Sequence, residues 1–430
     1  MITKTIWGEI IKDFQAKELP EFIERNIEYP LVTPIKRAVV IIGPRRSGKT
    51  YSMFQAIKKV MDSGTNKKCV FYVNFEDSRL LNASVDDLNN MLDMFFEIYP
   101  ENREHKTWFF LDEIQLIEKW ESFVRRLLDN EDIQVFVTGS SSKMMSKEIA
   151  SSLRGRSLIY HIFPFSFKEF LVANNVSFEK YLSSAERTKI INGLREYMEY
   201  GGYPESVIYK QERERILREI IDVTIYRDVI ERYKVKNIKV LRIFFTALFN
   251  SNMFSVHKFF NFLKSQGMKI SKNTLYTYFE YLCDSLIVYP VKKFAYSYKD
   301  VEGSISKIYF VDNGLLHSQG IKDKGRLMEN LVFSDLQKKW EKNLFYYRSF
   351  DGKEVDYVLK EGQKIEQLIQ VCYDIENYLT KEREIKGLFK ASRELKCSNL
   401  LVITWDYEYE ETIDGKKIFY QPLWKWLLRQ

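Results

Sequence analysis

Histidine and cysteine, two of the side chains that most often bind metal ions, are both scarce: the 430 residues include four of each. The cysteines are scattered, without the spacing of a zinc site or of a disulfide framework. No histidine is three or four residues from another, as two ligands on one helix face would be. These scarcities argue against a zinc enzyme and favour a protein of the reducing cytoplasm.

Long apolar segments are also missing. No run approaches the roughly 20 residues that cross a membrane, and residues 1–14 are amphipathic, without the apolar centre of a signal sequence. A hydrophobic content of 45% and a charged content of 29% are ordinary for a globular chain, so we expect no membrane partner. The formal net charge of +7 favours nucleic acid only weakly, because a solvated surface of this size accounts for it equally well.

The most informative motif is G-x-x-x-x-G-K-[ST], the phosphate-binding loop of nucleoside-triphosphate-binding proteins. It is formed by Gly43, Pro44, Arg45, Arg46, Ser47, Gly48, Lys49 and Thr50. An apolar run at 38–42 predicts a buried strand before it, and 51–61 predicts a helix after it. In such a loop Lys49 reaches the β- and γ-phosphates and the Thr50 hydroxyl binds Mg²⁺. The sequence therefore predicts ATP and Mg²⁺ as ligands.

A pair of acidic residues follows a second apolar strand, at residues 108–111. Ligands of open α/β sheets bind at the carboxyl ends of the strands, which is where this pair falls. Asp112 is the expected second Mg²⁺ ligand, and Glu113 is the expected general base for the attacking water.

A third strand, predicted at 133–137, ends in Thr138-Gly139-Ser140-Ser141-Ser142. A hydroxyl at this position could orient the water or sense the γ-phosphate, and we favour Ser140 over Thr138. The alternative is a polar turn that caps the next helix. A further strand is predicted at 69–75.

Together these motifs resemble those of a widespread archaeal and bacterial family of AAA+-like ATPases with a fused C-terminal region. The resemblance covers nearly the whole chain through residues 43–50, Leu-Asp-Glu-Ile-Gln at 111–115, Thr-Gly-Ser-Ser-Ser at 138–142, Leu-Arg-Gly-Arg at 153–156, Pro-Phe-Ser-Phe-x-Glu-Phe at 164–170, Gly-Gly-Tyr-Pro-Glu at 201–205 and Tyr-Arg-Asp at 226–228. It implies an additional-strand P-loop ATPase in which Glu113 activates water. It implies no particular cellular task.

Arg156 is the expected arginine finger, because ring-forming ATPases often supply an arginine to the γ-phosphate of a neighbouring subunit. That role would require a homo-oligomer. A contact with the phosphate of the same chain, or a plain surface arginine, are the alternatives.

The expected fold class is α/β, with four domains. Residues 1–162 form the parallel-sheet ATPase core with an N-terminal helix, and the helical periodicity of 163–236 resembles an AAA+ lid. Residues 237–305 resemble a winged helix-turn-helix, with helices at 238–249, 255–265 and 271–283 and wing strands at 286–291 and around Phe294. Double-stranded DNA would contact Lys269, Lys272, Asn273, Lys292 and Lys293. A module that serves only for packing is the alternative.

Residues 306–430 resemble the PD-(D/E)XK nuclease fold, a restriction-endonuclease-like α/β domain. In that fold a helix glutamate, a strand aspartate and a following acid-x-lysine hold a divalent metal. Glu329 and Asp356 match the first two, but Gln370 replaces the second acid and Cys372 replaces the lysine. We therefore expect a degenerate domain without nuclease activity. A coincidental α/β layout is the alternative.

The leading functional hypothesis is a Mg²⁺-dependent ATPase that couples ATP hydrolysis to conformational change while bound to DNA. The alternative is a nucleotide-gated signalling switch that binds a protein partner. An ATP-dependent nuclease is the third and least favoured hypothesis.

Overall fold

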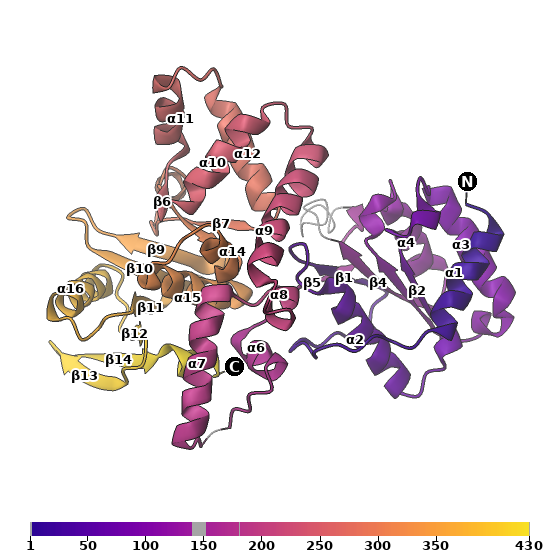
Figure 1. Ribbon diagram of the computed structural model, residues 1–430, viewed down its shortest axis with the longest axis horizontal. Coiled ribbons are helices and arrows are strands. Elements are labelled where there is room, and N and C mark those ends of the chain that lie inside the picture. The colour runs from indigo at the N-terminus through magenta and orange to yellow at the C-terminus, as the bar shows by residue number, and fades with distance from the viewer. Residues whose placement is uncertain (1, 140–151, 180, 430) are drawn as a thin grey trace. The chain divides into compact units, whose positions relative to one another are not determined.

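The structure, a computed structural model, describes residues 2–139, 152–179 and 181–429 (Figure 1). The chain divides into two compact units, with the boundary between Phe163 and Pro164. The first unit corresponds to the expected ATPase core. The second contains the other three expected domains in one contact network.

A five-stranded parallel sheet forms the centre of the first unit, in the order β2-β3-β4-β1-β5. The strands are β1 (Ala38–Ile42), β2 (Val70–Asn74), β3 (Thr107–Asp112), β4 (Ile133–Gly139) and β5 (Ser157–His161). Every residue of β1 and β4 is buried, as expected for central strands of a sheet covered on both faces.

Helices cover the two faces of this sheet. They are α1 (Lys4–Ala16), α2 (Lys49–Asp62), α3 (Val85–Ile98) and α4 (Trp120–Asn130). Because side chains alternate along a strand, Phe109 packs in the core with α1, α3 and α4, whereas Phe110 packs in the core with α2. The predicted strand–loop–helix order and the predicted acidic strand end are confirmed.

The second unit begins with helices. They are α6 (Phe167–Ala173), α7 (Ser184–Tyr200), α8 (Pro204–Ile208) and α9 (Arg213–Val223), and α9 continues into a π-helical stretch, Thr224–Glu231. Ser166 and Ser183 begin α6 and α7 with capping boxes completed by Glu169 and Glu186. The Tyr-Arg-Asp motif at 226–228 lies in the π-helical stretch, a conformation that is rare and often found at functional positions.

Three helices and a small antiparallel sheet follow. In chain order they are α10 (Ile238–Phe249), β6 (Met253–Phe254), α11 (Val256–Ser265), α12 (Lys272–Asp284), β7 (Val288–Val291), α13 (Tyr298–Glu302) and β8 (Ser306–Phe310). The sheet order is β6-β8-β7. The strand expected around Phe294 is replaced by β8, which the sequence analysis assigned to the C-terminal domain. Phe294 instead packs in the core of the larger sheet.

The C-terminal part is a six-stranded mixed sheet with flanking helices, in the order β13-β14-β12-β11-β10-β9. Its elements are α14 (Asn313–Ser318), α15 (Lys324–Trp340), β9 (Leu344–Arg348), β10 (Glu354–Glu361), β11 (Lys364–Cys372), α16 (Tyr378–Glu394), β12 (Leu400–Thr404), β13 (Tyr409–Ile413), β14 (Lys416–Pro422) and α17 (Leu423–Leu427). Strands β9, β10 and β11 pair antiparallel, while β11, β12 and β14 run parallel.

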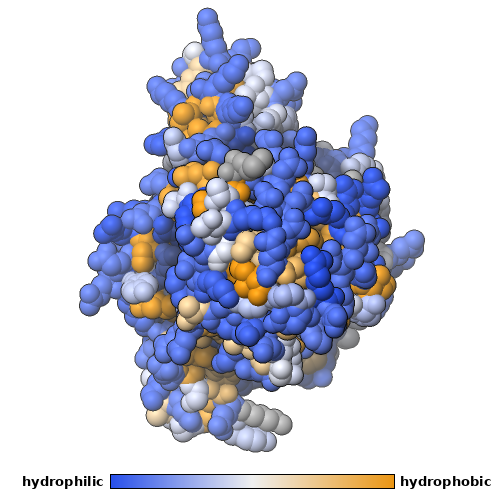
Figure 2. Space-filling view, turned by 90° about the vertical axis from the view of Figure 1, so that its right-hand side faces the viewer, coloured by the Kyte–Doolittle hydropathy of each residue, from blue (hydrophilic) through white to orange (hydrophobic). Residues whose placement is uncertain are grey.

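The face drawn in Figure 2 is mostly hydrophilic, with separate and small hydrophobic patches. Among the described residues, no helix combines the length and the apolar character needed to cross a membrane.

A buried carboxylate ties the helical segment of the second unit to its α/β part. Asp312, which precedes α14, accepts hydrogen bonds from the backbone N–H groups of Gly202 (2.7 Å) and Gly314 (2.8 Å). Burial raises the pKa of Asp312 to about 7, although these two hydrogen bonds act in the opposite direction. Gly201 has φ of +70°, and a Cβ at this position would lie 1.8 Å from Asp312 Oδ1. The Gly-Gly-Tyr-Pro-Glu motif therefore needs its first glycine for backbone conformation and for space.

We predict that Gly201→Ala lowers the free energy of unfolding by about 2–6 kcal/mol, the sum of a positive-φ backbone cost and an overpacking cost. Gly267→Ala is the matched control, because Gly267 has φ of +74° but nothing within 4 Å of the added Cβ. It should lose only about 1–2 kcal/mol. Urea unfolding of both variants checks this, and equal losses would show that contact with Asp312 is unimportant.

Candidate nucleotide-binding site

The loop at 43–50 connects the carboxyl end of β1 to the start of α2, and its backbone is adapted to that turn. Gly48 has φ of 96° and Arg46 has φ of 60°. A Cβ on Gly43 would lie 2.1 Å from the backbone oxygen of Ile162. Because α2 begins at Lys49, its first N–H groups lack helical partners and are available for an anion.

Two buried groups inside the loop fit a phosphate ligand. The Lys49 side chain is 5% exposed, and its ammonium donates hydrogen bonds to the backbone oxygens of Gly43 (3.2 Å) and Pro44 (3.1 Å). Ser47 is fully buried, and its hydroxyl has no hydrogen-bond partner among the described residues. A buried hydroxyl without a partner is costly, and a phosphate oxygen would satisfy it.

Asp112, at the end of β3, is fully buried and surrounded by hydroxyl groups. Its Oδ2 accepts hydrogen bonds from Thr50 (2.8 Å) and Tyr72 (3.1 Å), and its Oδ1 accepts one from Thr138. Burial raises the pKa of Asp112, and the hydroxyl contacts partly offset this. The structure thus brings together the hydroxyl and the carboxylate that were predicted to bind Mg²⁺, and both are oxygen donors of the kind that Mg²⁺ prefers.

Glu113 directly follows and has an unusual backbone. Its φ of 54° is in the left-handed region, which is unfavourable for a residue with a Cβ and is often retained at functional sites. Its N–H donates to the Thr138 hydroxyl (2.9 Å), and its carboxylate accepts a hydrogen bond from the Gln115 side-chain amide. Gln115, the last residue of the Leu-Asp-Glu-Ile-Gln motif, is therefore a positioning residue for Glu113.

Thr138 contributes more to this site than the sequence analysis expected. Its hydroxyl bridges Asp112 Oδ1 and the Glu113 N–H, so it links the two acidic residues. Ser140, which we favoured, lies outside the described residues. No local pattern marked Thr138, because its role follows from the register in which it pairs with Ile41, one position before β1 ends.

Arg25 was not among the predicted site residues, because it lies between α1 and β1, where the sequence contains no recognised motif. It is 9% exposed, and its guanidinium donates to the backbone oxygens of Ser47 (2.9 Å) and Phe163 (2.6 Å). One side chain therefore connects the phosphate-binding loop to the last residue of the first unit. Arg45, which was predicted to be part of the loop, forms an ion pair with Glu76, with 4.0 Å between Arg45 Nη1 and Glu76 Oε1.

Arg156 is not near the loop of its own chain. It precedes β5, whose first residue Ser157 pairs with Ala38, the first residue of β1. The loop follows the opposite end of β1, after Ile42. At its own edge of the sheet, Arg156 forms an ion pair with Asp129.

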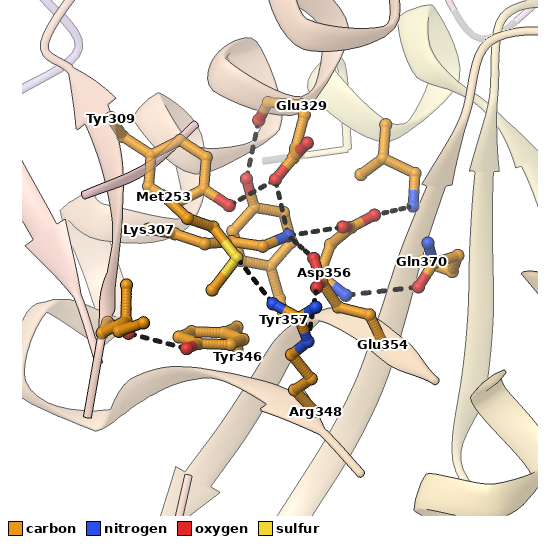
Figure 3. A network of polar contacts seen from close by, with 12 residues as sticks. Met253, Lys307, Tyr309, Glu329, Tyr346, Arg348, Glu354, Asp356, Tyr357 and Gln370 are labelled. Carbon is orange, nitrogen blue, oxygen red and sulfur yellow. Dashed lines mark hydrogen bonds and ion pairs between the residues drawn. The ribbon is translucent and has the colours of Figure 1, made fainter. Parts of the chain in front are cut away.

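The expected nuclease-like residues gather in the second unit (Figure 3). Gln370 Oε1 accepts a hydrogen bond from the backbone of Asp356 (3.2 Å), and Gln370 Nε2 donates to Glu384 (2.6 Å). Burial raises the pKa of Cys372 to about 12, so this residue is a neutral thiol. A cavity of about 630 Å³ adjoins Glu329, Asp356, Gln370 and Cys372.

Lys307 and Glu354, which were not among the predicted nuclease-like residues, also belong to this cluster. The ammonium of Lys307 lies 2.9 Å from Glu329, 2.7 Å from Glu354 and 2.8 Å from Asp356. Burial lowers the pKa of Lys307, but the three carboxylates more than compensate and raise it well above its usual range. A lysine and a third acid are therefore present, although neither comes from the expected motif positions.

Three family profiles match successive parts of the chain. An AAA domain matches residues 35–171, a domain of unknown function (DUF8612) matches 191–325, and another (DUF4143) matches 324–424. Uncharacterized protein MJ1544 of Methanocaldococcus jannaschii is 39% identical over 440 residues, covering 99% of this chain and 96% of the relative. An uncharacterized protein of Haemophilus influenzae is 29% identical over 392 residues, covering 90% and 93%.

Similarity to solved structures is weaker. The ORC2 protein of Aeropyrum pernix aligns with a TM-score of 0.41 and 11% identity, covering 70% of this chain and 89% of that one. DnaA from Aquifex aeolicus aligns with a TM-score of 0.23 and 17% identity, covering 48% and 67%. At these scores the assignment rests on the sequence relatives and the profile. The sheet and loop described above are those of a P-loop NTPase, and the chain belongs to the family of protein MJ1544, with an AAA domain at residues 35–171.

Proposed function

We propose that this protein is a Mg²⁺-dependent ATPase whose hydrolysis cycle changes the conformation of the chain. The observation that carries the proposal is the hydrogen-bonded group at the loop, in which Thr50, Asp112, Glu113 and Thr138 are joined through hydroxyl contacts. These residues come from α2, β4 and the carboxyl end of β3 with the residue that follows it, segments that are distant in the sequence. A P-loop fold alone would bring the strand ends together, but it would not require this chain of polar contacts.

Each side chain has a separate task in this proposal. Lys49, now hydrogen-bonded to backbone oxygens, would exchange these for phosphate oxygens of ATP, and Ser47 would gain a partner. Thr50 and Asp112 would hold Mg²⁺, which supplies positive charge to the β- and γ-phosphates when bound. Glu113 would take a proton from the attacking water. Gln115 and Thr138 fix the side chain and the backbone of Glu113, respectively.

Arg25 offers a route by which the loop could influence the second unit. Its guanidinium donates hydrogen bonds to the backbone oxygens of both Ser47 and Phe163. A movement of the loop on nucleotide binding would therefore shift Phe163, the last residue of the first unit. Such coupling between a ligand site and a chain exit is a common element of switching proteins. We also propose that Arg156 acts as an arginine finger on the nucleotide of a neighbouring subunit. Its position at the opposite edge of the sheet disfavours a contact with the phosphate-binding loop of its own chain.

We further propose that the module of α10, α11, α12 and the sheet β6-β8-β7 is a winged helix that binds double-stranded DNA. Its helix and strand order supports this, and so does its charge. Residues 232–279 contain no acidic side chain and nine basic ones: Arg232, Lys234, Lys236, Lys239, Arg242, Lys258, Lys264, Lys269 and Lys272. Seven of these are exposed, whereas Arg232 and Lys272 are half-buried.

This segment accounts for the basic character of the whole chain. Of the 66 basic residues, 57 lie elsewhere, together with all 59 acidic ones, so the remainder is slightly acidic. Concentrated positive charge favours phosphate binding far more than the same charge spread over a surface. Lys292, expected to contact DNA, instead forms an ion pair with Glu302, which reduces its availability.

The ATPase proposal predicts that Glu113→Gln binds ATP normally but hydrolyses it about 10²–10⁴-fold more slowly, because the general base is lost. Lys49→Ala should abolish turnover by removing the cation at the phosphates. Phosphate release and equilibrium binding of a fluorescent ATP analogue separate the two effects. Wild-type turnover in either variant would contradict this assignment of the site.

The DNA proposal predicts binding that weakens steeply as salt rises. The double variant Lys264→Glu/Lys269→Glu should bind at least tenfold more weakly and show a salt slope shallower by about two charges. Lys322→Glu/Lys324→Glu is the matched control, because it makes the same change of charge at two exposed lysines outside the basic segment. Fluorescence anisotropy with a duplex measures all three proteins. Equal weakening by the control would exclude a local DNA surface, and no binding by the wild type would favour the protein-partner switch.

A further inference from the structure

A lysine ammonium sits among three carboxylates in the second unit. Lys307 belongs to β8 of the small sheet, whereas Glu329 lies on α15 and Glu354 and Asp356 lie on β10 of the large sheet. Its Nζ lies within 2.9 Å of an oxygen of each carboxylate, and its side chain is only 5% exposed. In Figure 3 the three acids converge on this single nitrogen.

The surroundings are arranged to keep this group charged and fixed. Tyr309 donates a hydrogen bond to the same Glu329 oxygen that contacts Lys307, at 2.5 Å. The second oxygen of Asp356 accepts from the Val371 backbone (2.9 Å). On the other side of Glu354, Arg348 approaches to 4.0 Å. A buried ammonium is tolerated only when it is paired and hydrogen-bonded, and here both conditions are met.

A divalent metal would also be held by carboxylates gathered around one central cation, although among the described residues no group of three such side chains is already spaced to hold one. Two or three carboxylates from neighbouring elements around one central cation are the usual ligands of Mg²⁺ and Mn²⁺ in proteins. The oxygens around Lys307 lie 2.7–2.9 Å from its nitrogen, whereas Mg²⁺ holds its oxygens at about 2.0–2.1 Å. The carboxylates would therefore have to close in by less than 1 Å for a metal to replace the ammonium.

We propose that Lys307 is a resident cation that occupies the place of a divalent metal among Glu329, Glu354 and Asp356, and thereby closes this site to metal ions. The proposal concerns the second unit alone and does not depend on the ATPase. An ammonium supplies positive charge, but it has no open coordination position for a water or a phosphate, so it cannot replace a metal in hydrolysis. The cavity of about 630 Å³ beside it would then lack a metal for hydrolysis.

Lys307 also has a mechanical consequence. Because its backbone is in β8 and its partners are on β10 and α15, it holds the small sheet of the basic module to the large sheet. Removing the ammonium leaves three neighbouring carboxylates without their shared cation, and these would repel one another. A divalent metal could then restore the balance of charge that the lysine had provided.

The test is a Mn²⁺ titration of the full-length, nucleotide-free protein, followed by electron paramagnetic resonance. All samples carry Asp112→Asn, which removes the predicted metal ligand at the other site. With Lys307 present, we expect no saturable Mn²⁺ site that depends on Asp356. Lys307→Ala should gain one Mn²⁺ per chain, and Mn²⁺ should raise its unfolding temperature while leaving that of the lysine-containing protein unchanged.

The matched control is Lys307→Ala/Asp356→Asn, which should lose the gained Mn²⁺ site. Saturable binding in the lysine-containing protein that disappears with Asp356→Asn would overturn the proposal, because the site would then accept metal beside the lysine. A folded Lys307→Ala protein that binds no Mn²⁺ would overturn it as well. If Lys307→Ala does not fold alone, recovery of folding in Mn²⁺ supports the proposal, and failure to recover contradicts it.

Discussion

The proposed nucleotide site depends on one buried carboxylate, that of Asp112, and on the kind of groups that surround it. Its partners are three hydroxyls, from Thr50 on α2, Tyr72 on β2 and Thr138 on β4. Hydroxyls stabilise a buried carboxylate without neutralising it, so an ionised Asp112 would leave a negative charge at the site. That remaining charge is what a bound Mg²⁺ would compensate. The same contacts hold α2 and two neighbouring strands in fixed positions around the loop.

The second unit also contains buried carboxylates whose negative charge must be compensated, but it compensates that charge with a side chain of its own. Glu329, Glu354 and Asp356 are also gathered in a largely buried place, but their shared partner is an ammonium that supplies positive charge directly. A carboxylate that is surrounded only by neutral donors still needs a cation to balance its charge. Carboxylates that surround a lysine already have that cation in the ammonium group. The first cluster therefore has room for the charge of a metal ion, whereas the second already contains a positive charge.

Local patterns predicted most of the architecture. The apolar runs before Gly43 and Asp112 became parallel strands, and the helix expected at 238–249 was placed correctly to the residue. These elements are decided by periodicity and capping, which are properties of neighbouring residues. The loop and the acidic pair were also predictable, because the spacing that binds phosphate is contained in a few consecutive positions.

Residues brought together by tertiary packing were not predictable in this way. Lys307 precedes Asp356 by 49 positions and lies on a strand that was assigned to the wrong sheet, so no spacing rule could join them. Arg25 is in an irregular segment whose contacts depend on how it packs over the loop. Thr138 was undervalued because its importance follows from the register of β4 against β1 rather than from its own neighbours.

The role of Asp112 is tested by the Mg²⁺ dependence of ATP affinity in the wild type and in Asp112→Asn, by titration calorimetry with Mg²⁺ or with EDTA. If Asp112 supplies the charge that holds Mg²⁺, Mg²⁺ should tighten ATP binding by the wild type. The Asp112→Asn variant should still bind ATP through Lys49 and the loop, but with an affinity that is the same in Mg²⁺ and in EDTA. An undiminished Mg²⁺ effect in Asp112→Asn would contradict the account.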